Sequence, residues 1–216
     1  MLTLRLNMQR RSILSTSSSF LTSPKTAPTS SSIRQSFIQH PVKPFIETVT
    51  SFYTIDQDHT RVGLVNMPGA GGRVFVSNFL NSLSNRDSLE AVLNDLGHPV
   101  DEGGLYTAGS PALLTAAIQR ISSSASTPFF GYRPDITNHL VVLITGTTKF
   151  DDVTAAVAEA RRAKDNWGIV TVGMGKDVDA TVLQNISGGA PCTFVASDPF
   201  DLQLRGSLFV LDLIEK

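Results

Sequence analysis

The sequence predicts an α/β protein with a doubly wound, mostly parallel sheet, helices on both faces and one antiparallel edge strand, a Rossmann-like architecture. Two observations carry this prediction. Segments with strand patterning alternate with segments of helical periodicity, which implies parallel strands joined by right-handed crossovers. The run at residues 140–144 is apolar throughout, as expected of a central strand that is covered on both faces.

The elements before this run are a helix, a hairpin and two short helices. Pro44 suits the first turn of the helix, and the PGAGG segment at 68–72 suits a tight turn between the hairpin strands. In chain order, we expect a helix at 45–53, strands at 61–67 and 73–77, a helix at 88–96, a loop at 103–111 and a helix at 112–121.

A long polar loop at 122–138 leads into the central run. Alanines and two initial acids predict that the helix at 151–165 is the best in the chain. The remaining expected elements are strands at 169–172 and 193–196, a helix at 179–186, and a final helix from Asp198 or Pro199 that Gly206 weakens.

Composition limits the function classes. The chain has 216 residues and is 41% hydrophobic, which suits one domain with a tail. A net charge of −1 gives no indication of nucleic acid or an anionic membrane surface as partner. Cys192 is the single cysteine, so an intramolecular disulfide is excluded, and no apolar run reaches the roughly 18 residues of a membrane span.

Residues 1–36 form a basic segment rich in serine and threonine, and the predicted domain covers residues 37–216. The first acidic residue of the chain is Glu47. This composition fits an organellar transit peptide, a disordered tail or an incorrectly assigned gene start, and the last two readings together are favoured. A secretory signal is not convincing, because Arg5, Arg10 and Arg11 interrupt any apolar stretch.

An ordered set of segments resembles the von Willebrand factor type A domain, the family that includes integrin I-like domains. The set covers roughly residues 37–216. Its members are TRVGLV at 60–65, GGLYTAGSPAL at 103–113, LVVLITGTTKFDDV at 140–153, GIVTVGMG at 168–175, LQNIS at 183–187 and SDPFDLQ at 197–203. The resemblance implies protein binding, often in cell adhesion or the extracellular matrix, through a metal-ion-dependent adhesion site (MIDAS).

The metal-binding positions that the resemblance implies are degenerate in this chain. The nearest match to the family's Asp-x-Ser-x-Ser motif is Ser15, Ser17 and Ser19, with serine in place of the aspartate. Leu105 stands where the family has a threonine, and Gly146 stands where it has the second aspartate. Mg²⁺ needs oxygen ligands that include carboxylates. We therefore expect no cofactor, and Mg²⁺ only if this interpretation is wrong.

The family's first strand lies in the middle of the sheet, so the N-terminal segment must supply it. The best candidate lies near residues 12–19, where Ile13 and Leu14 are the apolar residues. We interpret this segment as a degenerate first strand or a replaced exon. Asp151 and Asp152 follow the central run, and helix N-terminal charge explains them better than metal ligation.

Other patterns are weaker. PGAGGR lies inside a hairpin and GMGKD lacks phosphate-loop spacing, while the four histidines are scattered. Phe129, Phe130 and Tyr132 in the long loop are either a binding surface or packed against the sheet.

The leading hypothesis is a non-enzymatic, metal-independent protein-interaction module. A protein partner of unknown identity would bind the loops at the carboxyl ends of the strands, and neither nucleic acid nor a membrane span is expected. The alternatives are a truncated or decaying family member and, less favoured, a nucleotide-binding enzyme. The location is extracellular by the family resemblance if the N-terminus is incomplete, and otherwise intracellular. The candidate contacts are Thr107, Ser110, Thr145, Thr147, Thr148 and Lys149.

Overall fold

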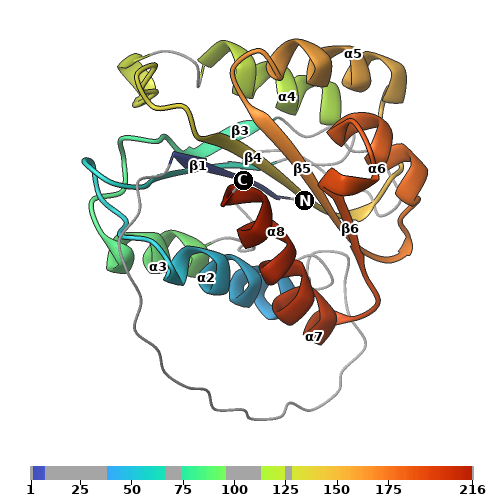
Figure 1. The fold of residues 1–216 in the computed structure, drawn as a ribbon, viewed down its shortest axis with the longest axis horizontal. Helices are drawn as coiled ribbons and strands as arrows, with labels where there is room; N and C mark the ends of the chain where they lie inside the picture. Colours follow the sequence, from blue (N-terminus) through green and yellow to red (C-terminus); the bar gives the residue numbers. More distant parts are fainter. Residues whose placement is uncertain (1, 8–37, 67–73, 96–112, 125–127, 216) are drawn as a thin grey trace.

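The computed structural model describes residues 2–7, 38–66, 74–95, 113–124 and 128–215. Within these residues, one six-stranded sheet has the order β3-β2-β1-β4-β5-β6 and helices on both faces (Figure 1). The strands are β1 (Leu2–Asn7), β2 (Arg61–Asn66), β3 (Phe75–Asn78), β4 (His139–Thr147), β5 (Gly168–Asp177) and β6 (Thr193–Ala196).

The helices fill the connections between the strands. The α-helices are α2 (Lys43–Ser51), α3 (Arg86–Asp95), α4 (Leu114–Ser124), α5 (Val153–Ala163), α6 (Ala180–Ser187), α7 (Pro199–Asp201) and α8 (Ser207–Ile214). Two π-helical segments, η1 (Ile38–Val42) and η4 (Leu202–Gly206), and two 3₁₀ turns, η2 (Pro128–Phe130) and η3 (Ala190–Cys192), complete the described elements.

Strand directions confirm the predicted fold class. β4, β5 and β6 pair in parallel, and β3 is the antiparallel edge strand beside β2. β1 pairs antiparallel with both β2 and β4, so β2 and β4 point the same way and β1 is reversed between them. This reversal in the middle of the sheet is a feature that the sequence did not predict.

The central position is thus held by Leu2–Asn7, whereas the sequence pointed to residues 12–19, which lie outside the described residues. The alternation of apolar and polar residues in LTLRLN is the signal that could have found this strand. The Asp-x-Ser-x-Ser-like pattern at residues 15–19 pointed to a later segment instead.

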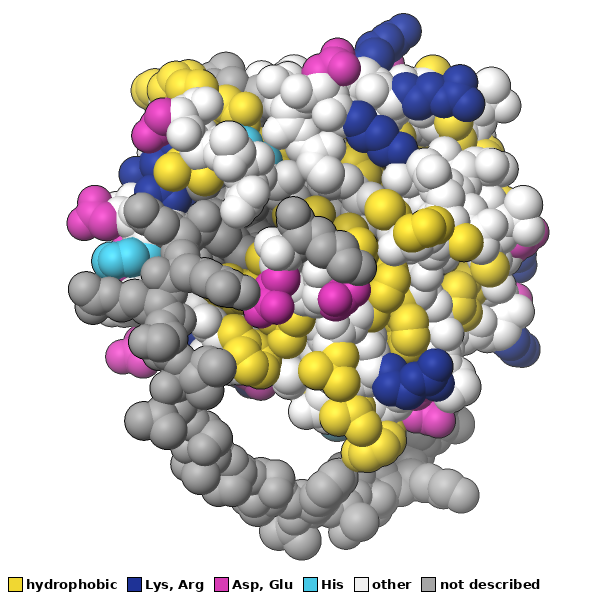
Figure 2. Space-filling model, in the orientation of Figure 1, with side chains coloured by type: hydrophobic (Ala, Val, Ile, Leu, Met, Phe, Trp, Pro, Cys, Tyr) yellow, Lys and Arg dark blue, Asp and Glu magenta, His cyan; other side chains and the backbone are white. Residues whose placement is uncertain are grey.

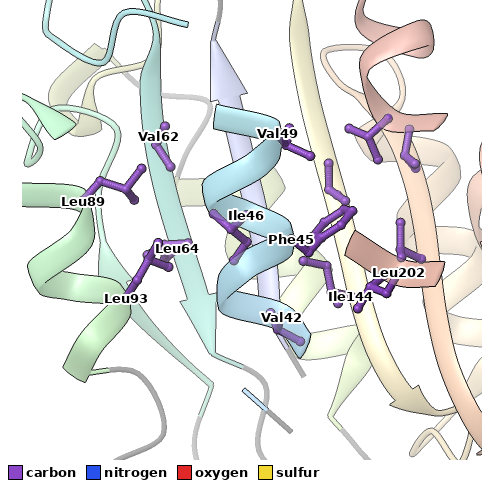
Figure 3. Packing of buried hydrophobic residues seen from close by; sticks show 14 of the residues in the cluster. Val42, Phe45, Ile46, Val49, Val62, Leu64, Leu89, Leu93, Ile144 and Leu202 are labelled. Atoms are coloured by element: carbon purple, nitrogen blue, oxygen red, sulfur yellow. The ribbon is translucent and has the colours of Figure 1, made fainter. Parts of the chain in front are cut away.

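Two hydrophobic cores lie on opposite faces of the sheet. On one face, Phe45, Ile46 and Val49 of α2 pack towards β2, β4 and the C-terminal helices (Figure 3). On the other face, α4, α5 and α6 pack on β4 and β5 around Trp167 and Leu183. Burying each large apolar side chain contributes about 1.5–3 kcal/mol. Helices on both faces explain why the first five residues after His139 are all apolar.

Local sequence explains where the crossover helices begin and end. Asp152 is the N-cap of α5 and accepts a hydrogen bond from the Ala155 backbone N–H at 2.9 Å. Asp179 caps α6 in the same way. Gly188 ends α6 with a φ of 93°, a conformation that glycine adopts without steric cost.

Most expected elements are present with shifted ends. The strand expected at 193–196 coincides with β6, and the helix expected at 151–165 is α5 with shorter ends. β5 continues to Asp177, beyond the expected stop near Gly173. The final helix contains a π-helical segment that ends at Gly206, the residue expected to weaken it. The expected turn at 68–72 and loop at 103–111 lie outside the described residues.

Candidate functional site at the carboxyl edge of the sheet

The carboxyl ends of β2, β4, β5 and β6 meet at one edge of the sheet, here named the carboxyl edge. In open α/β sheets, ligands bind in the loops at this edge. β4 ends there at Thr147 and β5 ends there at Asp177, and these two residues are paired. Because β1 is reversed, its first residue, Leu2, lies there opposite Asn66 and Ile144.

The loop after β4 is built by its own threonines. The Thr145 hydroxyl donates to the Thr147 carbonyl at 2.5 Å and accepts the Thr147 N–H at 3.1 Å. The Thr147 hydroxyl in turn accepts the Lys149 N–H at 3.1 Å. Thr145 is fully buried, Thr147 is partly exposed and Lys149 is exposed. Thr145 therefore shapes the loop, and Thr147 and Lys149 present polar groups at the surface.

Thr148 joins the loop after β4 to the loop after β5. Its backbone N–H donates to the Asp177 carbonyl at 3.0 Å, and its hydroxyl accepts the Asp179 N–H at 3.0 Å. The hydroxyl also lies 3.2 Å from the Asp177 carbonyl, to which it donates. A single side chain thus holds two loops in one arrangement, which the sequence did not reveal because the partners are about 30 residues away.

Gly146 lies where the ladder between β4 and β5 is irregular. The register shifts between Thr145 and Thr147, and Gly175 has a φ of 124° beside it. A Cβ atom on Gly175 would lie 3.5 Å from the Gly146 carbonyl oxygen, an ordinary contact. The backbones of the two loops are therefore close together here.

The next two acids along the chain after this loop accept hydrogen bonds at helix ends. Asp151 Oδ1 accepts the Leu114 N–H at 3.0 Å, at the start of α4, and Asp152 caps α5. The Asp152 carbonyl also accepts the Thr115 hydroxyl at 3.2 Å. Asp152 thus lies at the start of the helix where both acids were expected, whereas Asp151 precedes that helix and binds the start of α4 instead.

The residues that follow β4 offer few free oxygen ligands for Mg²⁺. Gly146 brings no side-chain oxygen, and the carboxylates of Asp151 and Asp152 already accept hydrogen bonds from helix N-termini. Among the described residues, no group of three or more His, Cys, Asp or Glu side chains is arranged to hold a metal ion. The predicted site residues Ser15, Ser17, Ser19, Leu105, Thr107 and Ser110 lie outside the described residues.

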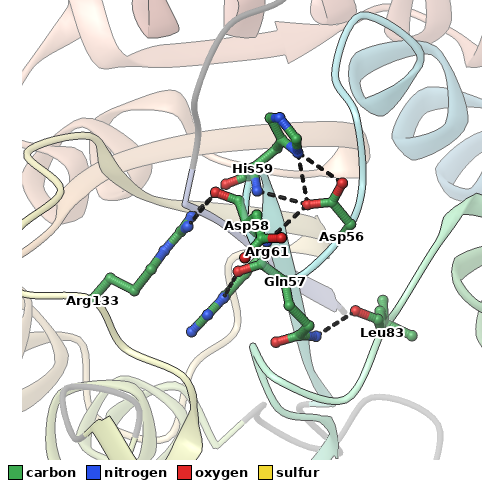
Figure 4. Close-up of polar contacts among 7 residues, drawn as sticks. All are labelled: Asp56, Gln57, Asp58, His59, Arg61, Leu83 and Arg133. Carbon is green, nitrogen blue, oxygen red and sulfur yellow. Dashed lines mark hydrogen bonds and ion pairs between the residues drawn. The ribbon is translucent and has the colours of Figure 1, made fainter.

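The opposite edge, where β2, β4 and β5 begin, is here named the amino edge. Asp56 accepts hydrogen bonds from the backbone N–H groups of Asp58 and His59 and contacts the His59 ring at 2.7 Å (Figure 4). The bond from the His59 backbone is the main reason that the pKa of Asp56 is lowered. Arg61 donates to the Gly131 carbonyl at 2.8 Å, which fixes the long loop before β4.

Arg133 extends this connection across the amino edge. Its guanidinium donates to the Asp58 carbonyl at 2.7 Å and to the His59 carbonyl. Gln57, in the loop that enters β2, donates to the Leu83 carbonyl at 2.6 Å. Side-chain bonds to backbone carbonyls therefore join three segments: the loop that enters β2, the loop that enters β4 and the turn at Leu83.

The loop before β4 contains Phe129, Phe130 and Tyr132, and its aromatic side chains are partly exposed at the surface and partly packed against the protein. Phe129 is 81% exposed and meets Phe130 edge to face, while Phe130 stacks on Phe79 at 4.3 Å. Tyr132 instead packs inwards on His139 at 4.3 Å and on Trp167 at 5.7 Å. The loop thus presents one aromatic side chain at the surface and uses the others for packing.

A second apolar surface lies on the C-terminal helices. Phe200, Leu204 and Leu208 are exposed at intervals of four residues, and Val195 of the edge strand β6 is also exposed. Figure 2 shows hydrophobic side chains at the surface over this part of the molecule. Such spacing places the three side chains along one side of a helix. Among the helices that the structure describes, none has the length and apolar character needed to cross a membrane.

Comparison with known proteins identifies the class. The family model of the von Willebrand factor type A domain matches residues 29–207. A curated relative, protein irg-7 of Caenorhabditis elegans, is 34% identical over 162 residues, which cover 71% of this chain and 7% of that protein. The chain therefore belongs to the von Willebrand factor type A family, and it corresponds to a small part of that relative's length.

Solved structures show the same fold at low sequence identity. Proximal thread matrix protein 1 from the mussel byssus matches with a TM-score of 0.67 and 17% identity, over 82% of this chain and 42% of that one. A further structure of that protein has zinc in its MIDAS motif. A von Willebrand factor type A protein from Catenulispora acidiphila matches with a TM-score of 0.52 and 12% identity, over 86% and 39% of the two chains.

Proposed function

We propose that this chain is a protein-binding module that engages its partner at the carboxyl edge without a divalent cation. Members of the family are commonly protein-interaction modules rather than enzymes, and this supports the general assignment. The observation that carries the particular site is the joined pair of loops, in which Thr148 ties β4 to β5 and leaves Thr147 and Lys149 accessible. A preformed surface loses little conformational entropy on binding.

The chemistry of these loops favours a partner with hydrogen-bond acceptors. Lys149 follows β4 and Lys176 lies next to the last residue of β5, and both side chains are exposed. Thr147, the last residue of β4, is partly exposed. Thr107 and Ser110 would add hydroxyls from the loop before α4. In a MIDAS, a carboxylate of the partner completes the coordination of the metal ion. In this chain, the same carboxylate would accept hydrogen bonds from lysine and hydroxyl groups instead.

Metal independence has separate support. Gly146 contributes no carboxylate, and Asp151 and Asp152 are engaged by helix N–H groups. The reversed strand places Leu2 at this edge, where the family has the carboxyl end of its first strand. An extracellular location is part of the same proposal, since one similar structure is that of a byssal matrix protein.

Quantitative capture of partners by the immobilised chain tests the proposal. We expect proteins retained by the wild type to be lost from a Thr147→Ala, Lys149→Glu variant and kept when EDTA replaces Mg²⁺. The matched control is Thr137→Ala, Arg161→Glu, which changes an exposed threonine and an exposed cation away from this loop. Release of the same proteins by EDTA would disprove metal independence, and equal capture by both variants would disprove the site.

A further inference from the structure

The reversed strand β1 is held differently from the other strands. It forms six residue pairs with β2 on one side and six with β4 on the other, all antiparallel. β4, β5 and β6 are instead linked in sequence by crossover helices and run parallel. β1 therefore resembles a strand added into a gap between β2 and β4, the way an extended peptide adds to a sheet.

The gap requires a strand. Two strands with buried side chains border it, with Val62 and Leu64 on β2 and Val142 and Ile144 on β4. Without β1, backbone groups of β2 and β4 would be unpaired in the middle of the sheet, and each unpaired buried group costs about 1–3 kcal/mol. Backbone pairing is largely independent of sequence, so this gap binds an extended segment mainly through its main chain.

The present occupant is not specialised for this position. A central strand covered on both faces is usually apolar throughout, whereas LTLRLN alternates and places Arg5 at the register position opposite Gly63 and Val141. The family match begins at residue 29, so β2 and β4 lie inside it and β1 lies outside. The two strands that border the gap thus lie in the matched region, and the strand that fills it comes from outside that region.

We propose that the gap between β2 and β4 is an exchangeable strand site, and that Leu2–Asn7 of a second copy of this chain fills it in a strand-exchanged dimer. Every residue pair of the single chain is reproduced in the exchanged form, so exchange loses no pairing. Residues 8–37 connect β1 to η1, and a 30-residue segment can span up to about 100 Å. This connection permits β1 to reach a neighbouring copy as well as its own gap.

Disulfide trapping between two chains that carry different cysteine substitutions tests the exchange. In a Cys192→Ser background, a Leu2→Cys chain is mixed with an Asn66→Cys chain, because these positions are paired in the sheet and paired Cα atoms lie within disulfide reach. The expected result is a cross-linked heterodimer whose yield rises with protein concentration. The matched control replaces Leu2→Cys by Asn7→Cys, at the far end of the same strand, and should give little product.

Three outcomes would overturn the proposal. Closure of a single chain carrying both Leu2→Cys and Asn66→Cys, with no cross-link between chains at any concentration, would mean that β1 stays in its own gap. Equal cross-linking by the Leu2→Cys and Asn7→Cys chains would mean unspecific contact. Failure of every combination to close would mean that β1 does not occupy the gap. Sedimentation of the unmodified chain should independently show a dimer that increases with concentration.

Discussion

At the amino edge, guanidinium groups and aromatic rings close the loops onto one another, whereas at the carboxyl edge Thr148 joins two loops whose neighbouring side chains stay accessible. His139 is 7% exposed and lies between Tyr132 and Trp167, while Lys149 is exposed at the other end of the same strand region. Both edges therefore have ordered loops, but they differ in the side chains that follow or precede the strand: the ring of His139 is buried where β4 begins, and Lys149 is exposed just after β4 ends. This difference separates a region that stabilises the fold from the region where we propose that a partner binds.

The largest effect is expected at the aromatic packing of the amino edge. Trp167 is 2% exposed, so Trp167→Ala should lower the free energy of unfolding by about 3–5 kcal/mol through lost burial and a cavity. Phe129→Ala is the matched control, because its ring is 81% exposed and its loss should cost about 0.5 kcal/mol or less. Urea unfolding measures both. Equal losses would mean that this edge does not depend on its buried rings.

Two glycines with positive φ allow a direct comparison of the edges. Gly131 has a φ of 89°, and a Cβ there would lie 2.5 Å from the Asn81 backbone nitrogen; Gly175 has a φ of 124° and only a 3.5 Å contact. Alanine at Gly175 should cost about 1–3 kcal/mol from conformation alone. Alanine at Gly131 should cost at least about 1 kcal/mol more, because the overlap forces the backbone to move. Thermal unfolding of both variants decides, and similar losses would contradict tight closure at Gly131.

The pH dependence of stability should reveal His139. Burial is the main reason that its pKa lies below the ordinary 6.5, and Arg133 also disfavours its charge, opposed by Asp135 and by the Arg133 backbone. Its ring faces Tyr132 and Trp167, and no described residue hydrogen-bonds its Nε2. The unfolded chain therefore takes up the proton first. Stability is fully present above pH 6.5 and is lost as the pH falls towards the folded pKa, by at most about 1.4 kcal/mol per pH unit.

Replacing the ring isolates this effect. His139→Phe keeps an aromatic ring against Tyr132 and Trp167 but cannot be protonated, so the loss below pH 6.5 should disappear from chemical denaturation curves. Asp56 and Asp201 provide a separate window, because their lowered pKa values add stability that is lost only as the pH falls through and below 3.8. If the His139→Phe variant still loses stability between pH 6.5 and pH 3.8, another group is responsible.

The same comparison shows what the sequence could reveal. Periodicity and capping residues located α5, α6, β4 and β6, because each of these signals is local. The contacts between loops at the amino edge could not be predicted from the sequence. Arg61 and Gly131 are far apart along the chain, and their hydrogen bond joins a side chain to a backbone carbonyl, which leaves no sequence pattern. The proposed binding loop was predicted from its position after β4, but the sequence could not show that Thr148 connects it to the end of β5, because those contacts are about 30 residues away along the chain.

The sequence predicted that the N-terminal segment supplies the central strand, but it did not predict which residues form that strand. The fold requires a strand between β2 and β4, and the Asp-x-Ser-x-Ser-like pattern pointed to residues 12–19. Strand direction is decided by pairing and by the length of the connection, neither of which has a local signal. Leu2–Asn7 fills the place in reverse, and this also changes which end of the strand reaches the carboxyl edge.

The smallest effect is expected from divalent cations at the carboxyl edge. Thermal unfolding of the chain in millimolar Mg²⁺ or Mn²⁺ should match unfolding in EDTA, because Gly146 supplies no carboxylate and Asp151 and Asp152 cap helices. A cation present at about 100 times its dissociation constant would add roughly 2.7 kcal/mol, a shift that is easily measured. A cooperative transition without a shift supports a binding edge built from hydroxyl and ammonium groups. An upward shift that Asp151→Asn removes would assign a metal ligand to that residue and contradict its role as a cap alone.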